Sequence, residues 1–197
     1  MLNVLVFLCS YLICAINPAI VISKKVIGTD IRNVGSGNAG TTNAMRTMGK
    51  GWGIVVFILD ALKVVIAYGV TMLLCSMFKG SNVVTAESIY IVAAIVGHCY
   101  PIYYNFQGGK GVVAILISCA FLEPKTTLVC LIVAIIIIFV SRMVSMGSLS
   151  AVVLFNIMIM VMEPKYLFGV MIASAIIIYK HRTNIKRIMN GEENKLF

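Results

Sequence analysis

The segment IVVFILDALKVVIAYGVTMLLCSMF, residues 54–78, decides the fold class of this chain. A helix needs about 20 mostly apolar residues to cross the hydrocarbon core of a bilayer, and this run meets that requirement. Its only charged side chains are Asp60 and Lys63, which lie one helical turn apart. Ionised side chains at membrane depth are costly and are usually paired or functional. The segment therefore predicts a membrane helix in which Asp60 and Lys63 form mainly an internal structural pair.

The rest of the chain extends this pattern. Hydrophobic residues make up 60% and charged residues 12% of the 197 residues, and the mean hydropathy is +1.01. Soluble domains average about half apolar and a quarter charged residues. The first apolar run lacks a basic n-region and a cleavage site, so we expect a retained span there and no signal peptide. The apolar segments are 2–22, 54–78, 88–106, 111–122, 126–140, 149–162 and 166–179.

These segments predict one all-α domain over residues 1–197, a polytopic integral membrane protein with about seven transmembrane helices. The last four segments are shorter than about 20 residues, so tight hairpin ends, polar flanks or partial insertion all remain open for them. Six cysteines are scattered through the apolar runs, with no CxxC pair and no cysteine–histidine cluster. We therefore expect no metal site, no disulfide framework and no cofactor.

The basic residues indicate the orientation in the membrane. When the breaks between segments alternate between two sides, one side receives twelve of the 16 Lys and Arg residues, the other receives three, and Lys63 lies within a segment. The positive-inside rule makes the richer side cytoplasmic, which places the N-terminus outside and the C-terminus inside. The net charge of +9 then reflects these loops and anionic lipid headgroups, and no nucleic-acid partner is expected. The twelve are Lys24, Lys25, Arg32, Arg46, Lys50, Lys110, Arg142, Lys180, Arg182, Lys186, Arg187 and Lys195.

A first polar stretch, GSGNAGTTNAMR, spans Gly35 to Arg46 on the cytoplasmic side. Its glycines allow backbone N–H groups to approach an anion without a Cβ in the way. Thr41, Thr42 or Asn43 is expected to cap a short helix whose N-terminus favours negative charge. Arg46 would lie on that helix as a bidentate phosphate donor. On these residues alone, an ordinary flexible loop with one solvated arginine fits equally well.

The second stretch, GHCYPIYYNFQGGKG, covers residues 97–111. Pro101 is expected to end the preceding helix. Gly108-Gly109-Lys110-Gly111 suggests a second backbone cradle with a lysine, although it is not a Walker A loop. His98 either donates to a carbonyl within the core or serves a site beside this cradle, and we favour the site.

Two further stretches complete the cytoplasmic side. SRMVSMGS, residues 141–148, is expected to be a compact turn, and residues 181–197 begin with an amphipathic helix. On that helix Ile185, Ile188 and Met189 share one face with His181 and Asn184. An ordinary surface helix would carry leucines at the last two positions, so we expect His181 and Asn184 to face a polar site.

Together, GSGNAGTTNAMRTMGKG, GHCYPIYYNFQGGKGV, SRMVSMGS and HRTNIKRIMNGEE resemble, in this order, the bacterial acyl-phosphate:glycerol-3-phosphate acyltransferase family. The resemblance covers nearly the whole chain. It implies an enzyme of the bacterial cytoplasmic membrane that uses acyl phosphate and glycerol 3-phosphate and makes 1-acylglycerol-3-phosphate and inorganic phosphate, the first acylation of phospholipid synthesis. The sequence of this chain differs from the usual family pattern at Thr41, Gln107 and Val113-Ala114. We expect the chain to function as a monomer with its active site on the cytoplasmic side.

The resemblance also implies which residues form the site. The catalytic group would be Ser36, Arg46, Lys110, His181 and Asn184. The substrate-binding group would be Gly35, Gly37, Asn38, Gly40, Asn43, His98, Gly108, Gly109, Gly111, Ser141 and Arg142. The other class of glycerolipid acyltransferase, with its HxxxxD motif, is disfavoured because neither histidine is followed by aspartate at that spacing.

Other functions and mechanisms remain open at this point. A transporter for phosphorylated molecules would also need basic cytoplasmic sites, whereas a purely structural scaffold leaves the four polar stretches unexplained. For the acyltransferase we expect that no side chain is an indispensable general base, because acyl phosphate has a good leaving group whose oxygens can accept the hydroxyl proton. The rival mechanism uses His181 or His98 as the base. No carboxylate is obviously paired with either histidine in the sequence.

The charge asymmetry leads to a labelling test of topology. Cysteines introduced at Ser36, Lys110 and Asn184 in a cysteine-less background should resist a thiol reagent that is confined to the outside, because all three positions are expected to be cytoplasmic. Permeabilised cells provide the control, in which all three should react. Labelling of any of them from the outside would contradict the orientation.

Overall fold

The computed structural model describes residues 1–196, and its regular elements in that range are helices, as predicted. Three short 3₁₀ helices, η1 (Ile31–Asn33), η2 (Ile102–Tyr104) and η3 (Pro164–Tyr166), lie between α-helices. The α-helices are α1 (Leu2–Cys14), α2 (Pro18–Val26), α3 (Thr41–Met48), α4 (Lys50–Met77), α5 (Val83–Cys99), α6 (Val112–Leu122), α7 (Pro124–Ser141), α8 (Val144–Met162), α9 (Leu167–Lys180) and α10 (Arg182–Met189).

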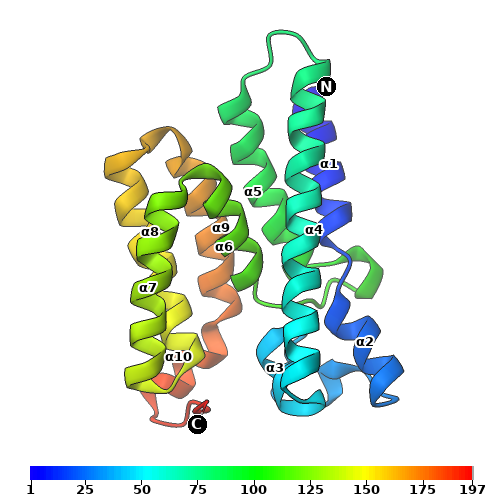
Figure 1. The fold of residues 1–197 in the computed structure, drawn as a ribbon, viewed down its shortest axis with the longest axis vertical. Helices are drawn as coiled ribbons and strands as arrows, with labels where there is room; N and C mark the ends of the chain where they lie inside the picture. The colour runs from blue at the N-terminus through cyan, green and yellow to red at the C-terminus, as the bar shows by residue number, and fades with distance from the viewer. Residues whose placement is uncertain (197) are drawn as a thin grey trace.

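The two ends of the helix bundle differ in character (Figure 1). The N-terminus lies at one end, together with the loop that joins α4 to α5. The short helices α2, α3 and α10 and the C-terminus gather at the opposite end. There α3 packs on α4, while α5 packs on both α1 and α9. The polar motifs of the sequence therefore meet at one end of the apolar helices.

Five helical segments are long and apolar enough to cross a membrane: Leu2–Val26, Lys50–Met77, Val83–Tyr104, Pro124–Ser141 and Val144–Met162. The multi-pass character predicted from composition is thus supported. Helices α6 and α9 have 11 and 14 residues. At 1.5 Å per residue they are about 17 and 21 Å long, less than the roughly 30 Å hydrocarbon core, so seven full crossings stay a prediction.

Helices α7 and α8 are longer than the sequence predicted. Pro124 occupies the first turn of α7, where its missing N–H is no loss. Val144 begins α8, so the expected turn at residues 141–148 shrinks to Arg142, with φ +60°, and Met143. The added helical turns carry polar side chains, so the apolar segments alone did not include them.

The first apolar segment forms one candidate span, Leu2–Val26, in agreement with the prediction, but its helix is interrupted. Helix α1 ends at Cys14 and α2 starts with Pro18, which cannot donate to a preceding carbonyl. Asn17 caps α2, since its Oδ1 accepts from the N–H of Ile20 at 3.1 Å. At the break, Lys63 Nζ of α4 donates to the carbonyl of Ile16 at 2.7 Å.

The Asp60–Lys63 pair is confirmed, with 2.7 Å between Lys63 Nζ and Asp60 Oδ1. A second buried carboxylate lies toward the other end of the bundle. Glu87 of α5 accepts hydrogen bonds from the hydroxyls of Tyr68 at 2.9 Å and Tyr166 at 2.7 Å. The Asp60–Lys63 pair lies within α4, whereas Glu87 links α5 to α4 and η3 through satisfied hydrogen bonds in an otherwise apolar interior.

Candidate active site

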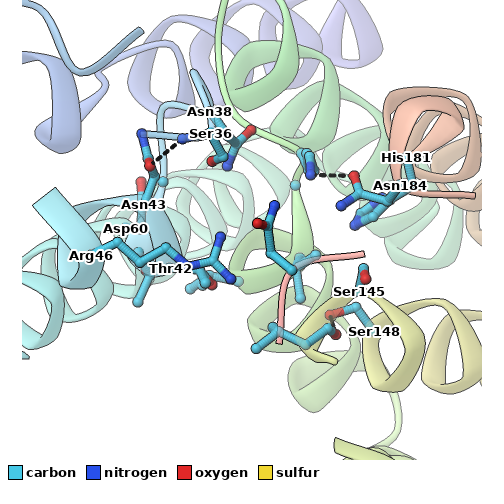
Figure 2. A pocket seen from close by; sticks show the side chains of 18 of the residues that line it. Ser36, Asn38, Thr42, Asn43, Arg46, Asp60, Ser145, Ser148, His181 and Asn184 are labelled. Carbon is cyan, nitrogen blue, oxygen red and sulfur yellow. Dashed lines mark hydrogen bonds between the residues drawn. The ribbon is translucent and has the colours of Figure 1, made fainter. Parts of the chain in front are cut away.

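A polar cavity of about 240 Å³ lies where the four polar motifs of the sequence meet. Ser36, Asn38, Asn43 and Arg46 line one side of it, and Ser145, Ser148, His181 and Asn184 line the other (Figure 2). The wall includes ten of the residues predicted for the site: Ser36, Asn38, Gly40, Asn43, Arg46, His98, Lys110, Gly111, His181 and Asn184. It does not include Gly35, Gly37, Gly108, Gly109, Ser141 or Arg142.

Asn43 organises the first loop. Its Oδ1 accepts from the N–H of Ser36 at 2.9 Å, and its Nδ2 donates to the carbonyls of Ile31 at 3.1 Å and Val34 at 3.0 Å (Figure 2 shows the bond to Ser36). Gly35 has φ +61°, and a Cβ there would collide with Asn43 Oδ1. The predicted cap is therefore wrong: Gly40 precedes α3, and no side chain caps the helix.

Two glycines of this loop use their N–H groups within the loop. The N–H of Gly37 donates to Val34 at 3.1 Å, and that of Gly40 donates to Asn38 at 3.1 Å. Positive φ at Gly35 and Gly37 allows this tight local folding. Gly37 and Gly40 therefore help to shape the loop, and backbone contacts between this stretch and an anion stay a prediction.

Two glycines of the second predicted cradle, Gly108 and Gly109, also use their N–H groups within the fold. The N–H of Gly108 donates to Cys99 and that of Gly109 donates to His98, each at 3.2 Å. A Cβ on Gly109 would collide with His98 Nε2 and lie 2.7 Å from the carbonyl oxygen of Ala39. These glycines let the loop pack against the end of α5, and only Gly111 and Lys110 reach the cavity wall.

Arg46 and Lys110 supply cations to the cavity as predicted. Arg46 lies in the last turn of α3, and Lys110 Nζ donates a short hydrogen bond to Asn184 Oδ1. Burial lowers the pKa of Lys110 to about 8, against the opposing effect of Glu193, while Arg187 and Arg46 lower it further. Lys110 is therefore a cation at neutral pH, and it loses its charge as the pH rises through about 8.

His181 and Asn184 face the cavity as the helical pattern predicted. A carbonyl can only accept, so His181 Nδ1–H donates to Ile177 at 2.8 Å and Nε2 is the acceptor of the neutral ring. Burial lowers the pKa of His181 to about 4. Met189, expected on the same face, is instead 81% exposed at the end of α10.

Glu193 is a site residue that the sequence reasoning missed. Its carboxylate accepts hydrogen bonds from Ser145 at 2.8 Å, Asn184 at 2.6 Å and Arg187 at 3.0 Å. Burial raises the pKa of Glu193, yet these three donors outweigh it and lower the pKa below its usual value. The acidic end of NGEE was visible in the sequence, but no spacing rule connected it to the cavity.

Asp60 is the second missed residue, because it lines the cavity as well as pairing with Lys63. Its Oδ1 lies 3.5 Å from His98 Nδ1. The expectation that neither histidine has a carboxylate beside it is therefore wrong for His98. Two helices, α4 and α5, bring these residues together, and no local pattern reveals that.

Ser141 has a different place from the one expected. Its hydroxyl donates to the carbonyl of Ile137 at 2.6 Å and accepts from the N–H of Met143 at 3.1 Å, which ends α7. Two serines of the same motif, Ser145 and Ser148, line the cavity from the first turns of α8. The extra helical turn of α8 explains this shift.

An apolar cavity of about 180 Å³ adjoins the polar one between α6, α7 and α8. The two cavities share Val112, Val144 and Ser148. Ile115, Leu131 and other aliphatic side chains form most of the second wall. The polar and the apolar cavity are therefore neighbours that share part of their walls.

Comparison with known proteins gives one consistent result. A family model described as glycerol-3-phosphate acyltransferase matches residues 4–191. A relative of that name from Clostridioides difficile is 36% identical over 98% of this chain and 95% of its own length. Another from Halalkalibacterium halodurans is 39% identical over 95% of this chain and 92% of its own.

Solved structures agree with the family model. One is described as an integral membrane glycerol 3-phosphate acyltransferase in its glycerol 3-phosphate form. It has a TM-score of 0.87 and 33% identity, and the match covers 98% of this chain and 94% of that one. The lysophosphatidic acid form has a TM-score of 0.84 and 31% identity, with the same coverage. The family resemblance drawn from the four motifs is confirmed.

The pKa of Lys110 predicts a pH-dependent affinity. A lysine is charged only below its pKa, so the cavity loses a cation as the pH rises through about 8. We expect the dissociation constant for glycerol 3-phosphate to rise about tenfold between roughly pH 7 and pH 9, since one charge-assisted hydrogen bond contributes about 1.5–3 kcal/mol. Titration calorimetry measures this. A Lys110→Arg variant keeps a permanent cation and should show a flat profile; parallel profiles for both proteins would contradict the role.

Proposed function

This chain belongs to the family of glycerol-3-phosphate acyltransferases, and we propose that it transfers a fatty acyl group from acyl phosphate to glycerol 3-phosphate. The products are 1-acylglycerol-3-phosphate and inorganic phosphate. The proposal joins the family assignment to the character of the two cavities. The proposal also specifies the acyl donor, which the names of the relatives do not state.

The observation that carries the proposal is the junction of the two cavities at Val112, Val144 and Ser148. A polar cavity with side-chain cations suits phosphate groups, and an apolar cavity among membrane helices suits an acyl chain. The reacting carbonyl of an acyl phosphate lies where those two parts of the molecule meet. We therefore place the transfer of the acyl group from donor to acceptor at this junction.

The cations have distinct surroundings that suit two phosphate groups. Arg187 is paired with Glu193, with 3.0 Å between Nε and Oε2. Arg46 and Lys110 have no carboxylate within ion-pair distance in residues 1–196. We assign the substrate phosphates to Arg46 and Lys110, with Ser36 as a hydrogen-bonding neighbour that orients a phosphate or the attacking hydroxyl.

The transfer step balances without a side-chain base. The primary hydroxyl oxygen of glycerol 3-phosphate attacks the carbonyl carbon, and a new C–O ester bond forms. The bond from that carbon to the bridging phosphate oxygen breaks, and its electron pair leaves with the phosphate. The hydroxyl proton passes to the departing phosphate, which leaves as hydrogenphosphate. The cations stabilise the charge that develops on it.

The histidines fit this mechanism as hydrogen-bonding groups. A general base works best when its pKa is near the operating pH, and His181, with a pKa of about 4, is a weak base. His98 Nδ1 lies beside Asp60, and its Nε2 side packs against Gly109, so the ring is enclosed by protein. We propose that both histidines orient groups in the cavity.

We propose that the enzyme lies in the bacterial cytoplasmic membrane with its active site on the cytoplasmic side. The support is the twelve-to-three distribution of basic residues, together with the gathering of α2, α3 and α10 at the end that holds the cavity (Figure 1). Seven crossings with the N-terminus outside complete this proposal. One chain supplies every residue named in the site, which suits a functional monomer.

The donor assignment is tested with purified protein and labelled glycerol 3-phosphate. Palmitoyl phosphate should support the formation of labelled lysophosphatidate with one equivalent of inorganic phosphate. Palmitoyl-coenzyme A should fail, because its thioester carries no phosphate beside the reacting carbonyl for the cavity cations to bind. Robust turnover with palmitoyl-coenzyme A would overturn the donor assignment. Uptake of glycerol 3-phosphate into sealed vesicles without lipid formation would indicate a transporter.

Arg46→Ala tests the cation on α3. Loss of one charge-assisted contact of about 1.5–3 kcal/mol should lower kcat/KM by roughly tenfold to a hundredfold. Steady-state kinetics with palmitoyl phosphate measures it, and Lys186→Ala, which removes an exposed cation of α10, is the matched control. Wild-type efficiency in a folded Arg46→Ala protein would exclude a phosphate-binding role.

A further inference from the structure

Three buried polar atoms in the described residues make no hydrogen bond of good geometry: Thr41 Oγ1, Asp60 Oδ1 and His98 Nδ1. Asp60 Oδ1 is paired by charge with Lys63 Nζ at 2.7 Å and lies 3.5 Å from His98 Nδ1, which leaves both atoms capacity for a better-aligned hydrogen bond. All three residues line the polar cavity. Asp60 is 1% exposed and His98 is 4% exposed. Buried polar groups are nearly always hydrogen-bonded, so such a cluster calls for a ligand with groups of its own to donate and accept. We call it the Thr41–Asp60–His98 cluster.

Building on the proposed function, we propose that the Thr41–Asp60–His98 cluster binds the secondary hydroxyl of glycerol 3-phosphate. The cluster would thereby select the glycerol backbone and fix which of its two hydroxyls is acylated. Its members come from the start of α3, the middle of α4 and the last turn of α5, so the folded bundle, and no single motif, creates it.

The charge of Asp60 decides what kind of group can bind there. A carboxylate in this wall repels phosphate and accepts hydrogen bonds from hydroxyls. Lys63 Nζ lies 2.7 Å from Asp60 Oδ1 and also donates to Ile16, so the carboxylate is held in place from behind. A carboxylate oxygen keeps a further lone pair when one cation is bound. Asp60 therefore presents an acceptor to the cavity.

The secondary hydroxyl is the group that remains after the other parts of glycerol 3-phosphate are placed. Its phosphate goes to the cavity cations, and its primary hydroxyl must reach the acyl carbon at the junction of the cavities. A secondary hydroxyl donates to Asp60 Oδ1 and accepts from the Thr41 hydroxyl or from His98 Nδ1–H, which lies 3.5 Å from that carboxylate oxygen. The three atoms thus match the donor and acceptor capacity of one alcohol.

The wild-type enzyme provides the first test. 3-Hydroxypropyl phosphate keeps the phosphate and the primary hydroxyl but lacks the secondary hydroxyl. We expect kcat/KM for it to be about tenfold to a hundredfold below that for glycerol 3-phosphate, because a site built to bind a hydroxyl rejects an analogue that leaves its polar groups unpaired. Equal efficiency for the two substrates overturns the cluster proposal while leaving the proposed function intact. No product from either substrate would overturn the proposed function instead.

Variants show whether the cluster causes the preference. Asp60→Asn should bring the ratio of the two efficiencies close to one, mainly by raising KM for glycerol 3-phosphate. Glu87→Gln, the same chemical change in the buried carboxylate outside the cavity, should keep the wild-type ratio. An Asp60→Asn protein with lowered kcat and an unchanged ratio overturns the proposal, since Asp60 would then act on the chemical step.

The Asp60→Asn change leaves Lys63 unpaired and can prevent folding. Two further variants test the proposal in that case. The double variant Asp60→Asn/Lys63→Met removes both charges and should show the same loss of preference. Thr41→Val removes a hydroxyl that makes no other hydrogen bond in the described structure and should lower the ratio severalfold. An unchanged ratio in the folded double variant or in Thr41→Val assigns the discrimination to other residues.

Discussion

The ion pair of Asp60 and Lys63 holds the site together from inside a membrane helix. Charges in an apolar interior are tolerated only when they are paired and well placed, and here Lys63 Nζ also satisfies the carbonyl of Ile16 at the break between α1 and α2. His98 of α5 lies beside the same carboxylate. One pair therefore fixes α4 relative to the helix break and to α5, and the wall of the cavity follows from that arrangement.

The glycines contribute by allowing close packing. Gly35 makes room for Asn43, which holds the first loop, and Gly109 makes room for His98. The N–H groups of Gly37, Gly40, Gly108 and Gly109 bond within the fold, so side chains at the cavity wall carry the charge that faces an anion. A side chain can be placed on any of several helices, so the site draws on α3, the start of α6 and α10 at once.

The sequence allowed the apolar helices, the end of α5 before Pro101 and the convergence of Arg46, Lys110, His181 and Asn184 to be predicted. The helices and their ends depend on composition and on proline chemistry, which are local, whereas the convergence of the four polar residues was implied by the family resemblance. The break before Pro18 and the cavity positions of Asp60 and Glu193 depend on contacts between distant segments. The hydrogen bonding within the glycine-rich loops could not be predicted, because a flexible loop and a tightly hydrogen-bonded loop can have the same residue types.

The balance of charge in the cavity explains how one site can serve two anionic substrates. Glu193 offsets Arg187, and Asp60 offsets Lys63, so within residues 1–196 Arg46 and Lys110 are the cavity cations that no carboxylate pairs. Two such cations suit the proposed assignment of one phosphate-bearing substrate to each. Additional cations would bind the substrates and products more tightly, but they would not accelerate the chemical step. Only contacts that are stronger in the transition state than in the ground state accelerate that step. The two carboxylates hold the donors around them in position, with Asn184 and Arg187 bonded to Glu193 and Lys63 paired with Asp60.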